Sequence, residues 1–349
     1  MFTTGERSSG CIEVYPVKRF KRLKKISVFF FFLLAILHCR AQLISTKPQE
    51  INVGPVNFNP EVIKQNKIRS IVLDMVDKPD GSIIIDRDAT QGFEFDTNGK
   101  VVRYYYTLLA RTETQEVEVP AVKRHGRIIR PAGTKTVMKY INDTVFANVF
   151  YDDENRVILK RTHIGDYYDA YYYEYNEKGK IKKETHCRET NISENKNEFK
   201  LGVQTILSSE TFEYEQLTPV QVKKKCINDE GREYKKAIIS YDTKGNKLYE
   251  NYDFIVSWMH EESDYEYNER GYLVKRIYIN NESGEVKLES IYEYDANGSL
   301  TSEKKMKGVI VQNEVSYLFD DATKLVKSQI DRDFKNASIG IIKYAYTFY

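Results

Sequence analysis

One short phrase recurs eight times along this chain and limits what it can fold into. The phrase is an alternating aromatic and polar run, an Asp or Asn, two polar residues, a Gly, and an apolar residue two positions later. The clearest copies are YEYNERGYL at 265–273 and YEYDANGSL at 292–300. The eight pairs of acid or amide and glycine-like residue are Asp96/Gly99, Asp152/Asn155, Asn176/Gly179, Asn228/Gly231, Asp242/Gly245, Asn268/Gly271, Asp295/Gly298 and Asp320/Thr323.

Each part of the phrase has a physical role. Alternating aromatic and charged residues predict a strand with one packed face and one face in water. The Asp or Asn side chain bonds the backbone two residues on, and Gly adopts positive φ without a steric clash. Together they predict a three-residue hairpin with a bulge. Asn155 suits the glycine position because Asn tolerates positive φ, whereas Thr323 predicts a differently built turn.

The spacing of the phrase predicts an all-β fold. Asp242, Asn268, Asp295 and Asp320 lie 26, 27 and 25 residues apart. With other turn-like stretches midway, the chain reverses roughly every 13 residues, which suits strands of ordinary length. We therefore expect an extended or curled antiparallel β-meander over about residues 90–349. The stretch 59–66, with Asn at the N-cap and Pro60 next, predicts one short N-terminal helix.

The expected segments follow from composition. Basic residues precede an apolar run at 26–37, followed by a small residue at Ala41, so residues 1–41 are typical of a cleaved signal peptide. An uncleaved membrane anchor and a lipid on Cys39 are alternatives. Residues 42–58 are expected to be an extended leader, 59–187 an N-terminal β segment, 188–215 a loop or boundary, and 216–349 a C-terminal repeat segment.

Net charge excludes one class of partner. The leader carries eight Lys/Arg and two Asp/Glu, so the chain without it has 45 basic and 49 acidic side chains and a net charge of −4. A chain with this balance lacks the excess of basic side chains that is typical of nucleic-acid-binding proteins. We expect an exported protein in the periplasm, on the outer surface or secreted. In such an oxidising compartment Cys187 and Cys226 either form a disulfide or remain two buried thiols.

No stretch carries recognisable catalytic chemistry. The histidines outside the leader have no zinc spacing, and the D-x-x-G turns lack the alternating ligands of a calcium loop, so we expect no metal and no cofactor. A basic cluster at Arg124, His125, Arg127 and Arg130 fits either an anion-binding site or a solvated hairpin tip.

Tyrosine is the other candidate binding residue. Tyr171, Tyr173 and Tyr175 share one strand face and predict an aromatic strip. Exposed rings in such a strip stack on sugars or peptides, whereas buried rings belong to the core.

The phrases Tyr241–Gly245 (YDTKG) and Tyr294–Gly298 (YDANG) resemble the tyrosine–aspartate repeats of RHS/YD-repeat proteins. The resemblance implies a long, curled β-sheet that forms a shell around a toxin or serves as a cell-surface or carbohydrate-binding structure. The aromatic, Lys- and Asn-rich composition also resembles envelope proteins of Bacteroidota.

The leading functional hypothesis is a non-enzymatic binding or structural scaffold of the cell envelope, with a polysaccharide or an envelope protein as partner. The alternatives are a hydrolase on a β scaffold and an outer-membrane β-barrel. Contact with the membrane is expected only through an uncleaved leader or such a barrel, and charged residues on both strand faces weigh against the barrel.

Overall fold

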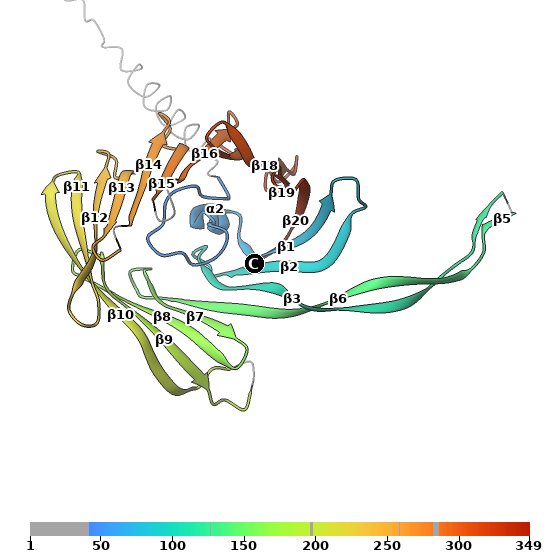
Figure 1. Cartoon of the computed structure of the whole chain (residues 1–349), viewed down its shortest axis with the longest axis horizontal. Coiled ribbons are helices and arrows are strands. Elements are labelled where there is room, and N and C mark those ends of the chain that lie inside the picture. Colours follow the sequence, from blue (N-terminus) through green and yellow to red (C-terminus); the bar gives the residue numbers. More distant parts are fainter. Residues whose placement is uncertain (1–41, 126, 196–197, 258, 282–285) are drawn as a thin grey trace, which may run out of the picture. The chain divides into compact units, whose positions relative to one another are not determined.

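The computed structural model describes residues 42–349 except 126, 196–197, 258 and 282–285 (Figure 1). The predicted signal peptide lies outside the described residues. One helix, α2 (Pro60–Gln65), is followed by strands. The strands of the main sheet are β1 (Ile68–Pro79), β2 (Ile85–Phe95), β3 (Val101–Val119), β6 (Gly133–Tyr151), β7 (Val157–Ile164), β8 (Tyr167–Tyr175), β9 (Ile181–Asn191), β10 (Leu201–Thr218), β11 (Gln221–Ile227), β12 (Glu233–Tyr241), β13 (Lys247–Phe254), β14 (His260–Tyr267), β15 (Leu273–Asn280), β16 (Val286–Tyr294), β17 (Leu300–Lys307), β18 (Ile310–Phe319), β19 (Val326–Asp333) and β20 (Ser338–Phe348).

The main sheet is a closed antiparallel barrel of 18 strands. Each strand pairs with its neighbours in sequence, and the circle closes because β1 pairs along its length with β20, from Ile68↔Phe348 to Pro79↔Ser338. The strands surround α2 (Figure 1). The prediction of an all-β fold with one short helix is confirmed, but the open or curled meander is wrong. The pairing that closes the sheet joins β1 and β20, which lie near opposite ends of the described chain. The alternation of residues within a strand does not indicate which distant strand it pairs with.

The recurring phrase forms its turns through one shared set of bonds. In the first copy the Asp96 carboxylate accepts from the amides of Asn98 and Lys100 at 2.9 and 2.8 Å. The Gly99 amide donates to the Asp96 carbonyl at 2.9 Å, and Gly99 has a φ of +83°. The turns at Asn176, Asp242, Asn268 and Asp295 repeat these bonds, with positive φ at Gly179, Gly245, Gly271 and Gly298. Asn155 takes φ +66°, whereas the Asp320 turn places its positive φ one residue later, at Lys324.

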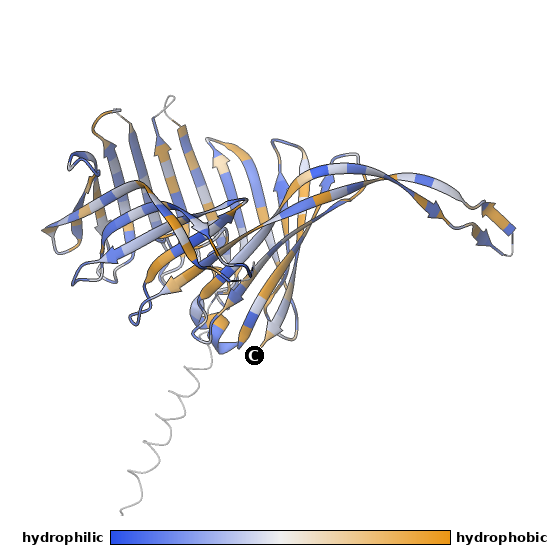
Figure 2. Ribbon diagram, turned by 90° about the horizontal axis from the view of Figure 1, so that it is seen from below, coloured by the Kyte–Doolittle hydropathy of each residue, from blue (hydrophilic) through white to orange (hydrophobic). Residues whose placement is uncertain are grey.

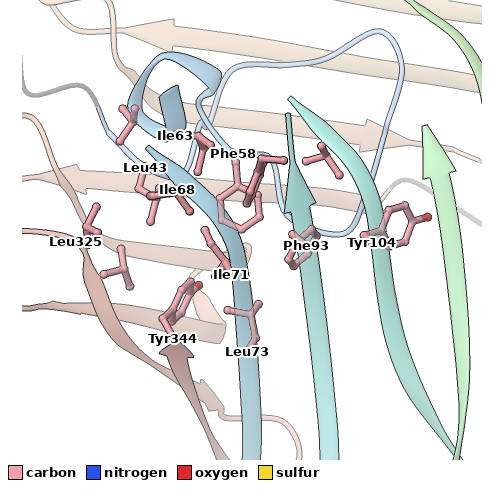
Figure 3. Close-up of a cluster of buried hydrophobic side chains, with 14 of the residues drawn as sticks. Leu43, Phe58, Ile63, Ile68, Ile71, Leu73, Phe93, Tyr104, Leu325 and Tyr344 are labelled. Atoms are coloured by element: carbon pink, nitrogen blue, oxygen red, sulfur yellow. The ribbon is translucent and has the colours of Figure 1, made fainter. Parts of the chain in front are cut away.

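The helix is fixed inside the barrel by apolar packing. Asn59 caps it by accepting from the Glu61 amide, and Val62 and Ile63 are buried. Ile63 packs with Ile71 and Phe93 from the wall in one cluster (Figure 3). In this cluster the packed face of the strands is therefore the face toward the lumen. No helix among the described residues is long and apolar enough to span a bilayer.

The opposite face of the wall is charged. Tyr292 and Tyr294 pack against the inner cluster, so Glu293, which lies between them, points outward. Ion pairs join neighbouring strands on this outer face, and hydrophilic and hydrophobic residues alternate along the strands (Figure 2). Examples are Lys304 with Glu293 at 3.2 Å, Lys304 with Glu314 at 3.7 Å and Lys275 with Glu289 at 3.3 Å.

The expected boundary at 188–215 is a hairpin within the barrel. Strand β9 runs to Asn191, and β10 begins at Leu201 and pairs with both β9 and β11. The register between β9 and β10 shifts between Leu201 and Gln204 and again between Ile206 and Ser208. Each such irregularity reverses the alternation of side chains, which explains why the sequence there has no strand pattern.

A two-stranded arm leaves the barrel. Strand β3 pairs with β2 only from Val101 to Tyr106, and β6 pairs with β7 only from Ala147 onward. The remaining parts of β3 and β6 pair only with each other, from Thr107↔Thr144 to Val119↔Gly133. The small hairpin of β4 (Val122–Arg124) and β5 (Arg127–Arg130) ends this arm, far from the helix (Figure 1).

Candidate functional site

Residues 43–58 form a strap across the barrel interior. Its two ends pair, because the Ser45 amide donates to the Asn57 carbonyl at 2.7 Å and Ile44 bridges Phe58. The loop between them contacts opposite parts of the wall. The Thr46 hydroxyl bonds the Tyr294 hydroxyl on β16 at 3.0 Å, and Lys160 on β7 donates to the Asn52 carbonyl at 3.0 Å. The segment expected to be an extended leader thus fills part of the lumen.

Two pockets lie between the strap and the wall. The smaller has a volume of about 340 Å³ and is lined by apolar strap residues such as Ile51 and Val53 together with Tyr151 and Tyr175. The larger has a volume of about 500 Å³ and is lined by strap residues 47–50 and by strands β10–β14. Its wall is rich in two residue types, the tyrosines Tyr214, Tyr241, Tyr252 and Tyr267 and the lysines Lys180, Lys224, Lys244 and Lys247. We call this larger space the lysine–tyrosine pocket.

The charge of the lysine–tyrosine pocket is positive. Two of its lysines are paired, since Lys224 contacts Glu50 at 3.2 Å and Lys247 contacts Glu250 at 2.7 Å. Among the described residues, Lys47, Lys180 and Lys244 have no ion-pair partner, and no acidic residues besides those two glutamates line the pocket. Three lysines without an ion-pair partner therefore line one cavity.

Burial strengthens this electrostatic character. It lowers the pKa of Lys180, with Glu50 opposing the shift and Lys178 and Lys224 adding to it. A cation that is poorly solvated gains more from binding an anion. Burial also raises the pKa of Tyr214, Tyr241 and Tyr252, so their hydroxyl groups remain protonated.

The tyrosine hydroxyls divide into bonded and available groups. Tyr214 donates to the Ile181 carbonyl at 3.0 Å, and Tyr267 donates to the Lys247 carbonyl at 2.9 Å. Among the described residues the Tyr241 and Tyr252 hydroxyls bond no protein group. The pocket therefore offers ammonium groups, hydroxyl donors and aromatic faces together, the set that binds an anionic ligand rich in hydroxyl groups.

The predicted tyrosine strip faces the lumen. Tyr171, Tyr173 and Tyr175 do share one face of β8, but Tyr173 is buried with Val149 and Ile181. Tyr171 stacks on His186 with ring centroids 4.3 Å apart, and the Tyr175 hydroxyl donates to the Val157 carbonyl at 2.7 Å. Of the three, Tyr175 lines a pocket, the smaller one. These rings support the wall; a direct role in ligand binding stays a prediction.

The predicted basic cluster lies elsewhere. Arg124, His125, Arg127 and Arg130 are exposed at the tip of the arm, on β4, on β5 and in the turn between them. The structure does not bring them near the tyrosines of β8 or into the lysine–tyrosine pocket (Figure 1).

The two cysteines are free and buried. Cys226 lies two residues after Lys224 on β11 and therefore on the same face of the strand. Lys224 contacts Glu50 of the strap, so this face points into the lumen. Cys187 pairs with Ala170, whose neighbour Tyr171 packs against the inner cluster, and so faces outward. In the structure the two cysteines thus lie on opposite faces of the sheet and form no disulfide with each other, and their state in an oxidising compartment stays a prediction.

The sequence did not identify the lysine–tyrosine pocket. Lys180 and Lys244 belong to copies of the turn phrase, and the phrase itself predicts only a turn at these positions. The signal that marks them is positional, because turns at one end of a closed barrel converge around its mouth. No group of metal-binding side chains occurs among the described residues.

His260 lies between two carboxylates on the outer face. Its Nδ1 is 3.0 Å from Asp253 and its Nε2 is 3.3 Å from Glu262. The hydrogen bond to Asp253 raises the pKa of His260, burial opposes the shift, and Glu262 adds to it. The imidazolium form is thus favoured by folding.

We expect this triad to make stability depend on pH. A raised pKa in the folded state contributes stability that is present below the unfolded value and is lost as the pH rises through the folded value. The His260→Gln variant should lack this loss. Urea unfolding across the range in which imidazole titrates measures it, with His125→Gln at the exposed arm tip as the control. Parallel pH profiles for the wild type and His260→Gln would contradict the prediction.

Comparison with known proteins gives distant structural likenesses. No protein-family model and no curated protein matches this sequence. A porin-like protein from Bacteroides uniformis ATCC 8492 aligns with a TM-score of 0.37 and 12% identity, covering 81% of this chain and 97% of that one. A porin-like protein from Bacteroides vulgatus ATCC 8482 aligns with a TM-score of 0.31 and 9% identity, covering 80% and 98%.

A third likeness is to the crystal structure of TcdB2-TccC3-Cdc42, with a TM-score of 0.28 and 11% identity. The alignment covers 70% of this chain but only 12% of that one. Membership of the RHS/YD family stays a hypothesis.

Proposed function

We propose that this protein is an exported barrel of the cell envelope that binds an acidic saccharide in the lysine–tyrosine pocket. The single observation that carries the proposal is the convergence of unpaired lysines and free tyrosine hydroxyls on one cavity of about 500 Å³. A cavity of this size suits a small ligand, since ligand pockets are typically about 300–1,000 Å³. It is too small for a folded protein domain.

The chemistry of the wall favours a sugar acid over other small anions. Tyrosine rings present flat apolar faces on which pyranose rings stack, and their hydroxyls bond sugar hydroxyls. Lysine supplies a mobile point charge that suits carboxylate or sulfate groups in several orientations, whereas a planar bidentate site would use arginine. None of the described residues that line this pocket is an arginine.

The hydrolase alternative meets an obstacle in the same pocket. Its two carboxylates are Glu50 and Glu250, and each is held by a lysine and a tyrosine: Glu50 by Lys224 and Tyr214, Glu250 by Lys247 and Tyr265. Glycoside hydrolysis requires one carboxyl group to act as a general acid. Such a group must be protonated, and apolar surroundings favour its protonated form. Here both carboxylates are bonded to a cation, so the pocket favours binding without cleavage.

The outer-membrane alternative is favoured by one observation, the closed barrel with an even number of antiparallel strands. This architecture fits that alternative better than it fits an open binding sheet. The outer face differs from that of membrane barrels, which is apolar where it meets lipid. Lys304, Lys275 and Glu289 occupy it, and a lysine at the bilayer midplane costs about 2–4 kcal/mol. We therefore propose that the barrel stands in water.

Fractionation separates these two possibilities. A barrel that stands in water is released from the envelope by alkaline carbonate without detergent. A barrel that crosses the outer membrane stays in the pellet until detergent is added, and that result would replace our proposal with the membrane alternative.

Binding of acidic oligosaccharides tests the proposed ligand. Titration calorimetry should show saturable binding of oligogalacturonate or a sulfated oligosaccharide, and weak or no binding of a neutral glucan of equal length. Because Lys180 and Lys244 line the pocket without ion-pair partners, Lys180→Glu and Lys244→Glu should each weaken binding by roughly tenfold or more. The matched control is Lys182→Glu, an exposed residue two positions from Lys180 that does not line the pocket.

Two results would contradict the proposal. One is equal affinity for the acidic and the neutral oligosaccharides. The other is an equal loss of affinity in Lys180→Glu and Lys182→Glu, which would show that general surface charge and not the pocket holds the ligand.

A further inference from the structure

The arm, formed by the distal parts of β3 and β6 and by the hairpin of β4 and β5, extends beyond the wall of the barrel. Its distal strands pair only with each other, and an isolated two-stranded ribbon is at best marginally stable in water. At about 3.3 Å per residue, the thirteen residues from Thr107 to Val119 carry the tip roughly 40 Å along the ribbon. The arm therefore presents its tip well away from the lumen.

The tip combines one sign of charge with exposed apolar side chains. Residues 119–142 contain six Lys/Arg and one His but no Asp or Glu. In the same hairpin Ile128 is 60% exposed and Ile129 is 62% exposed, and each lies next to an arginine. Apolar side chains of this size are costly to leave in water without a partner.

We propose that the arm tip docks on an anionic phospholipid surface, with its basic side chains at the headgroups and Ile128 and Ile129 inserted at the boundary with the acyl chains. Charge complementarity identifies this occupant. Basic side chains near an anionic leaflet are attracted to it, and apolar residues beside them add binding that salt does not screen. The outer face of the barrel, with acids and bases interspersed, offers no such one-signed surface.

Geometry also favours a broad surface over a pocket in a partner protein. All seven residues of β4 and β5 are exposed, and Arg124 pairs with Arg127 across the turn with no carboxylate between them. Side chains that project from both faces of a narrow ribbon can all contact lipid when the ribbon lies in the headgroup region of a bilayer, as the residues of interfacial anchors do. The sequence alone left open whether the basic cluster binds an anion, and we assign anionic phospholipid as its ligand.

Vesicle co-sedimentation of the full chain tests this inference. Vesicles of equal parts phosphatidylcholine and phosphatidylglycerol should bind the protein, and vesicles of phosphatidylcholine alone should not. Arg124→Glu/Arg127→Glu should reduce binding by at least roughly tenfold. Ile128→Ser/Ile129→Ser should retain binding at low salt but lose the part that survives at high salt.

The matched control is Lys223→Glu/Lys225→Glu, which reverses two charges on the outer face of β11 and should bind like the wild type. All of these residues lie outside the core, and circular dichroism with thermal unfolding verifies that each variant keeps the barrel. Equal binding to the neutral vesicles would overturn the proposal. Unchanged binding by Arg124→Glu/Arg127→Glu would also overturn it, as would arm-dependent dimerisation without vesicle binding, which would identify a second copy as the occupant.

Discussion

Gly99→Ala should destabilise the barrel far more than the same change at any other turn glycine of the repeated phrase. A Cβ atom at this position would lie 2.0 Å from the Pro60 carbonyl oxygen and 3.0 Å from the Lys64 amide nitrogen. Both are backbone atoms of the lumenal helix, so neither can turn away as a flexible side chain would. The helix has to move, and its movement disrupts the packing of Ile63 against the wall.

The magnitude follows from two separate costs. Alanine at φ +83° is strained by about 1–2 kcal/mol. Displacing packed backbone adds about 1–3 kcal/mol or more, by analogy with overpacked cores. We therefore expect a total loss of about 2–5 kcal/mol, a large part of the stability of a marginally stable domain.

Gly245→Ala is the matched control for this prediction. Gly245 has a φ of +84°, and a Cβ there meets no atom within 4 Å. It should show the backbone strain alone, about 1–2 kcal/mol. Urea unfolding of both variants measures the difference. Equal losses would mean that the helix does not sit against the turn at Gly99, and would contradict the prediction.

This pair of glycines shows what the sequence could and could not predict. The turn phrase predicts hairpins because its Asp and Gly act within five residues, and the structure forms these turns with one set of bonds. The phrase is the same at Gly99 and Gly245, yet only Gly99 touches the helix. That difference depends on residues 60–64 entering a barrel that closes through β1 and β20, an arrangement that no local pattern contains.

The candidate site was hidden for the same reason. Alternation predicted that one face of β8 carries Tyr171, Tyr173 and Tyr175, but it could not show whether that face is exposed or points into a lumen. Lys180 and Lys244 lie in separate turns, and only ring closure together with the strap brings them to one cavity. The arm tip, in contrast, was predicted as a basic hairpin because all of its residues are close in sequence.

Glu189→Met should be the most destabilising side-chain change on the outer face. Glu189 is fully buried and accepts from Arg161 Nε at 2.7 Å, from Gln204 at 2.8 Å and from the Tyr172 hydroxyl. The Arg161 guanidinium lies 3.7 Å from the ring centroid of Phe199, which covers it. Removing the carboxylate leaves a buried cation without its counter-charge, and we expect a loss of about 3–5 kcal/mol.

Replacing both charges should restore most of this loss. Arg161→Met/Glu189→Met buries no charge, and such apolar pairs are often as stable as the ion pair they replace. The exposed pair Arg111–Glu113 serves as the control, because both side chains are about half exposed or more and Glu113→Met should cost less than about 0.5 kcal/mol. If the double variant were no more stable than Glu189→Met, lost packing and not the uncompensated charge would be the cause.

The same carboxylate should set the acid sensitivity of the barrel. Burial alone would raise the pKa of Glu189, but the hydrogen bonds from Arg161, Tyr172 and Gln204 outweigh it and lower the pKa below its usual value. A lowered folded-state pKa contributes stability that is present above the unfolded value and is lost as the pH falls through the folded one. Urea midpoints should therefore fall with acidification more steeply in the wild type than in Arg161→Met/Glu189→Met. Parallel profiles would show that other carboxylates control acid unfolding.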